Sequence, residues 1–129
     1  MAKHLTLFEV RQFDDTICAS LTEAVRKTIS REFSLEANLI RAQIARNKGK
    51  NLIIRIPESS QAGPEHVRSL VRLLREARDH GGAAAFCGGG EAFQQLLGRL
   101  KLSRQWAWYP SLEQAVAAIR NTASEQRIR

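Results

Sequence analysis

Short runs of β-branched and aromatic residues alternate with longer stretches in which apolar residues recur every three or four positions. The run at 51–56 is rich in isoleucine and is followed by a proline, which is typical of a strand. The run at 83–87 is small and apolar throughout, as in a strand that is covered on both faces. Residues 105–109 hold two tryptophans and a tyrosine. The pattern therefore predicts strands near 51–56, 83–87 and 105–109.

A stretch with the 3.6-residue period of an amphipathic helix follows each of these strands. The clearest is 65–79, and its apolar stripe consists of Val67, Leu70, Val71, Leu74 and Ala77. Pro64 suits the first position of this helix, and the glycines at 81–82 suit a left-handed C-terminal cap. Similar spacing predicts helices near 91–101 and 111–120, with a serine placed to cap the last one.

The first fifty residues give a weaker pattern. A strand is predicted near 5–10, because apolar and β-branched residues dominate there. A helix is predicted near 35–47, and its inward-facing residues are Leu39, Ile40 and Ile44. Both predictions continue the alternation of strands and helices seen later in the chain.

Residues 14–33 have two interpretations. The segment 20–23 reads Ser-Leu-Thr-Glu, which is a capping box, and the apolar residues around it keep helical spacing. These local signals favour a helix. The topology of the predicted fold instead favours a strand within 22–33 that pairs with the first strand. The choice stays open from the sequence.

The order strand–helix–strand–helix–strand–helix from residue 51 onward predicts an α/β fold with parallel strands. No Pro/Gly/Ser-rich linker and no internal repeat divides the chain, so one domain is predicted over 1–121. Residues 122–129 are polar and are predicted to form a C-terminal tail.

The 129 residues contain two cysteines, Cys18 and Cys87, without the spacing of a zinc site. No apolar stretch reaches the length of a transmembrane helix and no secretory signal is visible, so the cytoplasm is the expected compartment. The net charge of +7 is spread over both halves of the chain without a run of five like charges. This distribution favours solvated faces over a nucleic-acid-binding surface.

Residues 51–120 resemble the later part of a STAS domain, the fold of anti-sigma-factor antagonists and sulfate-transporter tails. The strand at 52–56 falls where the family has its hydrophobic strand before the signature loop, and the paired glycines at 81–82 fall before the next strand. The segment 109–115 reads Tyr-Pro-Ser-Leu-Glu-Gln-Ala and is similar to the family's last turn and helix. The resemblance implies a mixed sheet of about four to five strands packed by about four helices.

The chain departs from the family at the signature loop. That loop reads Asp-Ser-Ser-Gly in the family, and its second serine is the usual phosphorylation site. Here it falls on Gly63-Pro64-Glu65-His66, so Glu65 stands where the family has the phosphorylated serine. Arg55 stands where the family has an acidic residue at the end of the preceding strand. The resemblance therefore implies either a fixed negative charge at the switch position or the loss of the switch.

A shifted alignment gives a second interpretation of the loop. Glu58-Ser59-Ser60 also resembles Asp-Ser-Ser, which makes Ser59 and Ser60 alternative phosphorylation sites. This alignment carries a proline into the interior of the following helix, where proline costs about 3 kcal/mol. The sequence therefore favours the first alignment.

Three arginines, Arg68, Arg72 and Arg75, are predicted to share one face of the helix at 65–79, directly after this loop. In the structural interpretation, the three arginines simply lie on a helix face that is exposed to solvent. A docking surface for an acidic patch explains them in functional terms, because arginine pairs with carboxylates through two parallel hydrogen bonds. His66 is predicted to lie exposed on the first turn of the same helix.

A glycine triplet, Gly88, Gly89 and Gly90, lies between a predicted strand and a predicted helix, where phosphates bind in nucleotide-binding folds. No GxGxxG or Gly-Lys-Ser/Thr motif accompanies it, and an acidic residue follows. A tight turn therefore explains the triplet better. No GxSxG motif or Cys–His pairing at motif spacing predicts a hydrolase.

These observations predict a non-enzymatic regulatory module without a cofactor or metal, resembling an anti-sigma-factor antagonist. Its protein partner is expected to be an anti-sigma or kinase-like regulator, a stressosome-type assembly or a transporter. The predicted contact surface includes the signature loop and the three arginines. The alternatives are a small-molecule or nucleotide-binding domain that uses the glycine triplet, or a STAS-type accessory subunit of a transporter.

Overall fold

The structure is a computed structural model that describes residues 7–22, 30–47, 49–58 and 63–128. These residues form five strands and four helices. Their bounds are β1 (Phe8–Phe13), β2 (Thr16–Leu21), α1 (Ser30–Arg46), β3 (Asn51–Ile56), α2 (Pro64–Asp79), β4 (Ala84–Gly88), α3 (Gly90–Arg99), β5 (Ala107–Tyr109) and α4 (Leu112–Ile128). The predicted α/β fold class is confirmed.

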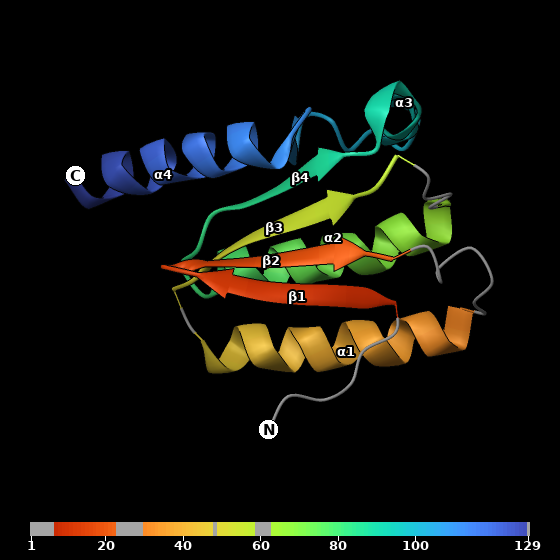
Figure 1. Ribbon diagram of the computed structural model, residues 1–129, viewed down its shortest axis with the longest axis horizontal. Helices are drawn as coiled ribbons and strands as arrows, with labels where there is room; N and C mark the ends of the chain where they lie inside the picture. The colour runs from red at the N-terminus through yellow and green to blue at the C-terminus, as the bar shows by residue number, and fades with distance from the viewer. Residues whose placement is uncertain (1–6, 23–29, 48, 59–62, 129) are drawn as a thin grey trace.

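The five strands form one sheet in the order β1-β2-β3-β4-β5, so each strand lies beside its neighbours in the chain. β1 pairs antiparallel with β2, and the other three pairs are parallel, which makes the sheet mixed. Figure 1 shows α1 and α2 running alongside each other, and both pack on one face of the sheet, while α4 lies alongside β4 and packs on the other face. Within the described residues, no helix is long and apolar enough to cross a bilayer.

Two hydrophobic cores lie on opposite faces of the sheet, because alternate residues of a strand point to opposite faces. Leu52, Ile54 and Ile56 of β3 face the larger core, which also contains the apolar stripes of α1 and α2. Ile53 faces the smaller core, which it shares with residues of β4 and α4. Both faces of β3 and β4 are therefore covered along most of their length, which explains the apolar runs at 52–54 and 84–87.

The open question about residues 14–33 is answered by strand β2, which spans Thr16–Leu21 and pairs with β1. The predicted capping box is wrong, because Ser20 lies within this strand. The strand that pairs with β1 therefore lies before the predicted range 22–33. Of that range, residues 30–33 belong to helix α1, and residues 23–29 lie outside the described residues. Ile17 and Leu21 share one face both in a helix and in a strand, so their spacing did not distinguish the two.

Several other element ends differ from the predictions. β1 lies at 8–13 instead of near 5–10, and residues 1–6 lie outside the described residues. α1 begins five residues before the predicted position 35, and Leu39 is only half-buried, while Ile40 and Ile44 are buried as predicted. α4 continues to Ile128, through most of the stretch predicted as a polar tail.

Candidate functional site

The first turn of α2 is held by a cap made from its own residues. Gly63 is the N-cap, Pro64 occupies the first helical position as predicted, and the amide of Val67 donates to the carbonyl of Gly63 (3.1 Å). The amide of Gly63 in turn donates to Nδ1 of His66 (3.0 Å). The imidazole therefore takes the place that glutamate or glutamine takes in a capping box.

His66 is half-buried, so the prediction that it lies exposed is wrong. Its ring meets the ring of Phe33 on α1 edge to face, with 4.7 Å between the ring centroids. Burial lowers the pKa of His66 below its usual range, and the charge of Glu65 opposes this effect. Since Nδ1 accepts a hydrogen bond, the cap requires that this nitrogen carry no proton. His66 therefore acts as a neutral positioning residue for the start of α2.

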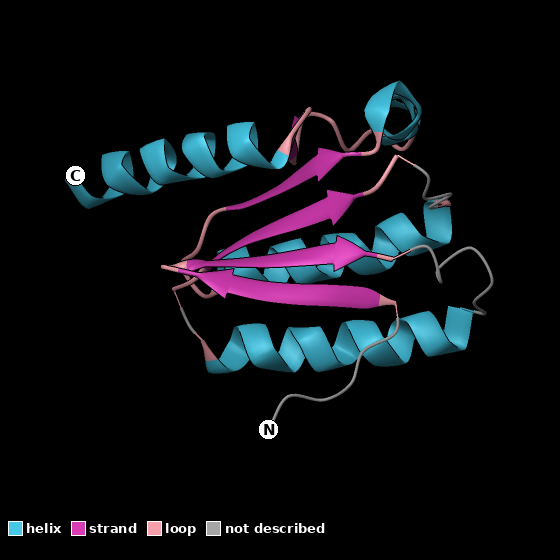
Figure 2. Cartoon of the chain, viewed as in Figure 1, coloured by secondary structure: helices cyan, strands magenta, loops and turns pink. Residues whose placement is uncertain are grey.

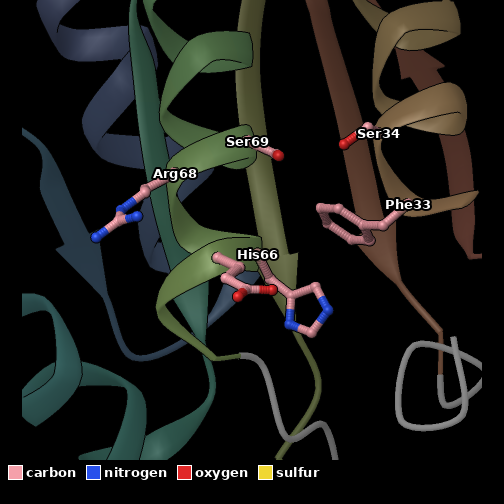
Figure 3. A pocket seen from close by; sticks show the side chains of 6 residues that line it. Phe33, Ser34, His66, Arg68 and Ser69 are labelled. Carbon is pink, nitrogen blue, oxygen red and sulfur yellow. The ribbon is translucent and has the colours of Figure 1, made fainter. Parts of the chain in front are cut away.

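A hollow of about 290 Å³ opens between the first turns of α1 and α2. Its lining residues are Phe33, Ser34, Glu65, His66, Arg68 and Ser69. Figure 3 shows the Ser69 and Ser34 side chains facing each other across the gap between the two helices. The rings of Phe33 and His66 lie together at one end of it, and the Arg68 side chain extends away from the gap. The hollow thus has an aromatic floor at one end and hydroxyl groups along its sides.

A second, smaller hollow of about 60 Å³ continues along the same two helices. It shares Ser34 and Ser69 with the first hollow and adds Arg72 of α2 and Arg41 of α1 to the lining. We call the two hollows together the α1–α2 groove.

An ionic cluster that includes Arg41 of the second hollow also ties α1 to α2. Nε of Arg41 donates to one carboxylate oxygen of Glu76 (2.8 Å), and Nε2 of His80 lies 2.8 Å from the other. The hydrogen bond from Arg41, followed by that from His80, lowers the pKa of Glu76. The Glu76 carboxylate therefore stays ionised at neutral pH and fixes the spacing of the two helices at this end.

Arg68, Arg72 and Arg75 are all exposed on α2, as predicted for one solvated face. We call them the arginine stripe. Arg78, also on α2, is not part of the stripe, because its guanidinium stacks over the ring of Trp106, 4.1 Å from the ring centroid. The stripe begins beside the mouth of the groove, since Arg68 and Arg72 each line one of its hollows. Three positive charges therefore stand next to a concave, partly aromatic surface.

The structure brings most of the predicted site residues together at the start of α2. Gly63 and Pro64 form the cap, Glu65, His66 and Arg68 line the first hollow, Arg72 lines the second, and Arg75 lies one turn further along. The alternative phosphorylation sites, Ser59 and Ser60, lie outside the described residues.

Three lining residues were missed by the sequence analysis: Phe33, Ser34 and Ser69. The first two were missed because α1 was predicted to begin only at 35. Ser69 was overlooked because a single serine within a helix carries no motif. The positions of all three depend on the packing of α1 against α2, which no local pattern encodes.

Arg55 is the exposed residue of β3 and lies on the same face of the sheet as Ile53, opposite α1 and α2. Its register partners are Ser20 on β2 and Cys87 on β4. Arg55 therefore belongs to a different surface from the groove. It is not part of the candidate site.

The glycine triplet is required by the backbone of the turn between β4 and α3. Gly88, Gly89 and Gly90 all have positive φ values, of 81°, 76° and 62°. A Cβ on Gly88 would lie 2.4 Å from the carbonyl oxygen of Ile56, and one on Gly89 would lie 2.5 Å from Cβ of Phe93. The triplet thus has a structural role in a tight turn, and it lines neither hollow of the groove.

The two cysteines are buried and lie on β2 and β4, with β3 between them. Burial raises the pKa of the Cys18 thiol and raises that of the Cys87 thiol to about 12. Neither thiol is ionised at neutral pH, so neither has the reactivity of a catalytic thiolate. The described residues contain no group of three or more His, Cys, Asp or Glu side chains that could hold a metal ion.

Solved structures of other proteins superpose on this chain and share its fold. No family model matches the chain, and no curated protein matches it. An anti-sigma-factor antagonist (STAS) domain protein from Planctomyces limnophilus superposes with a TM-score of 0.70 at 16% identity, covering 88% of this chain and 97% of that one. The NMR structure of the protein TM1081 superposes with a TM-score of 0.71 at 17% sequence identity, covering 93% of this chain and 94% of that one. A crystal structure of TM1081 from Thermotoga maritima, a putative anti-sigma factor antagonist, superposes with a TM-score of 0.58 at 15% sequence identity. It covers 88% of this chain and 94% of that one. The STAS fold that the sequence resembles is thereby confirmed.

Proposed function

We propose that this protein is a non-enzymatic regulatory module that binds an acidic surface of a partner protein through the arginine stripe and the adjoining α1–α2 groove. The observation that carries the proposal is the exposed stripe beside a concave surface at the start of α2. The likeness to an anti-sigma-factor antagonist (STAS) domain protein supports this kind of role. An anti-sigma or kinase-like regulator is the class of partner that this likeness favours.

The chemistry of the groove suits recognition better than catalysis. Two lining residues, Glu65 and His66, are of the general-base type, and Nδ1 of His66 is engaged by the amide of Gly63. The arginine guanidinium groups, by contrast, are placed to form paired hydrogen bonds with carboxylates of a partner.

The proposed contact is tested by reversing charge on the stripe. We expect the double variant Arg68→Glu/Arg72→Glu to bind the partner at least about tenfold more weakly, because opposite charges across an interface become like charges. The partner is first isolated from native lysate on the immobilised wild-type protein. Its dissociation constant is then measured with purified proteins by calorimetry.

The matched control is Arg99→Glu/Arg104→Glu, which changes the net charge equally at exposed positions outside the groove. This control is expected to bind as the wild type does. Equal weakening by both double variants would refute the stripe as the contact surface, since it would assign the effect to net charge alone.

Glu65 is proposed to act as a permanent negative charge where STAS relatives carry a phosphorylatable serine. It lies in the first turn of α2, where the helix dipole favours a negative charge. It also lines the first hollow, so its carboxylate borders the surface that the partner is proposed to contact. A fixed charge there makes binding independent of phosphorylation at position 65.

We expect Glu65→Gln and Glu65→Ser to change partner affinity to a similar extent, because both remove the charge while Glu65→Gln keeps the shape. The interaction of the Glu65 charge with the dipole of α2, which both variants remove, corresponds by itself to about 0.3–1 kcal/mol. Titration calorimetry with the isolated partner measures both variants against the wild type. Phosphatase treatment of the wild type is expected to leave its affinity unchanged.

Two outcomes would contradict this role of Glu65. Wild-type affinity in Glu65→Gln would show that the charge has no part in binding. Stoichiometric phosphate on Ser59 or Ser60, coupled to a change in affinity, would instead favour the shifted alignment of the loop.

A further inference from the structure

Strand β1 is the outermost strand of the sheet, so one of its long edges pairs with no strand among the described residues. The amide of Thr22 donates to the carbonyl of Leu7 (2.9 Å), which identifies the residues of this segment that bond toward β2. In an antiparallel pair, such residues alternate with residues whose backbone groups point outward. The backbone N–H and C=O groups of Phe8, Val10 and Gln12 therefore point away from β2.

Two charged side chains flank the middle of this edge. Val10 packs against the larger core, so its neighbours Glu9 and Arg11 lie on the opposite face of the sheet. The side chains of Glu9 and Arg11 are 58% and 77% exposed and form an ion pair with 2.8 Å between nitrogen and oxygen. In the view of Figure 2, no helix of the described chain lies in front of β1 and β2. The edge thus presents a negative and a positive charge, one on each side of Val10.

We propose that β1 pairs with β1 of a second copy of this chain, antiparallel about a two-fold axis beside Val10. In this register Val10 lies opposite Val10 of the second copy, and the outward backbone groups form a new antiparallel ladder. Glu9 then lies opposite Arg11 of the second copy, and Arg11 lies opposite Glu9. Both are non-hydrogen-bonded positions, at which cross-strand side chains come closest, with Cα atoms about 4.5 Å apart.

The two charges distinguish this register from the alternatives. A parallel pairing in register places Glu9 against Glu9 and Arg11 against Arg11. An antiparallel pairing centred on residue 9 or on residue 11 also brings two like charges together, which destabilises cross-strand pairs. Charged residues on an edge strand ordinarily oppose indiscriminate pairing. Here they oppose the wrong registers and favour the one centred on Val10.

The proposed contact has the self-complementarity that a two-fold symmetric interface requires. It involves a single strand from each copy, so the buried surface is small and the association is expected to be weak. The arginine stripe lies on α2, away from this edge of the sheet. The dimer is therefore independent of the proposed function, and either proposal can fail without the other.

Sedimentation velocity between about 10 μM and about 1 mM tests the dimer, because a small interface gives dissociation constants in this range. The wild type is expected to change from monomer to dimer as the concentration rises. Glu9→Arg and Arg11→Glu each place like charges opposite each other at both positions, so each variant alone is expected to stay monomeric. An equimolar mixture of the two variants has opposite charges at both positions again and is expected to dimerise.

The controls separate the edge from net charge and from misfolding. Glu113→Arg and Arg104→Glu make the same charge changes at exposed positions on other elements and are expected to dimerise as the wild type does. Thermal unfolding verifies that the edge variants remain folded, which their exposure leads us to expect. The amide of Val10 is expected to exchange more slowly with solvent as the protein concentration rises. A wild type that is monomeric throughout, single variants that still dimerise, or a mixture that stays monomeric would each overturn the proposal.

Discussion

Leu74→Ala is expected to lower the free energy of unfolding by about 2–5 kcal/mol, the range for truncating a fully buried leucine. Leu74 lies in the middle of α2 with 0% of its surface exposed, within the larger core between the helices and the sheet. Truncation to alanine removes three side-chain carbon atoms and leaves a cavity that the close-packed core around it closes only in part. Chemical denaturation of the wild type and of Leu74→Ala measures the difference in their free energies of unfolding.

Arg72→Ala is the matched control on the same helix. Arg72 is exposed, so its truncation is expected to change the free energy of unfolding by about 0.5 kcal/mol or less. The two denaturation midpoints are compared under the same conditions. A larger loss for Arg72→Ala than for Leu74→Ala would show that α2 turns the opposite face toward the sheet.

Gly88→Ala is expected to have a comparable effect for a different reason. The residue has φ 81°, a conformation that costs an alanine about 1–2 kcal/mol. In addition, the new Cβ would lie 2.4 Å from the carbonyl oxygen of Ile56, its register partner on β3. Overpacking of this kind costs about 1–3 kcal/mol more. We therefore expect a total loss of about 2–5 kcal/mol by denaturant titration.

Gly90→Ala separates the conformational cost of a positive φ from the cost of the steric overlap. This residue also has a positive φ, of 62°, but a Cβ there would meet no atom within 4 Å. Its replacement is expected to cost only the conformational part, about 1–2 kcal/mol. An equal loss in both variants would contradict the steric contact between Gly88 and the backbone of β3.

The same glycines bear on the alternative of a nucleotide-binding turn. Three consecutive positive φ values let the chain reverse direction within a short turn at the end of β4. The indole N–H of Trp108 donates to the carbonyl of Gly88 (2.8 Å), which ties this turn to β5. The turn is thus held by contacts of the fold itself, and its sequence is explained without a ligand.

Helix α2 shows how much a strong local pattern determines. The bounds predicted from periodicity, proline and glycine were 65–79, and the helix spans Pro64–Asp79. The buried residues include all five of the predicted stripe. Gly81 has φ 94°, as the predicted left-handed cap requires. These features agree because the periodicity, the first-turn proline and the cap act within a few residues of one another.

Strand β2 shows where local patterns mislead. Its apolar residues, Ile17, Ala19 and Leu21, alternate with residues on the other face, but Ile17 and Leu21 also fit one face of a helix. Pairing with β1 on one side and β3 on the other decided between the two. Backbone hydrogen bonds between strands depend on partners distant in the sequence, so they override a local preference for helix.

The α/β class, the later strands and helices, and the place of Glu65 at the start of α2 could all be predicted from the sequence. Those features depend on periodicity, caps and turns, which are properties of short segments. The hairpin of β1 and β2 at the edge of the sheet, by contrast, emerges only in the folded protein. The same holds for the hollow around which Phe33 and Ser34 of α1 meet His66 and Ser69 of α2. Such contacts depend on how two helices pack on the same sheet, and that packing is fixed by the whole core at once.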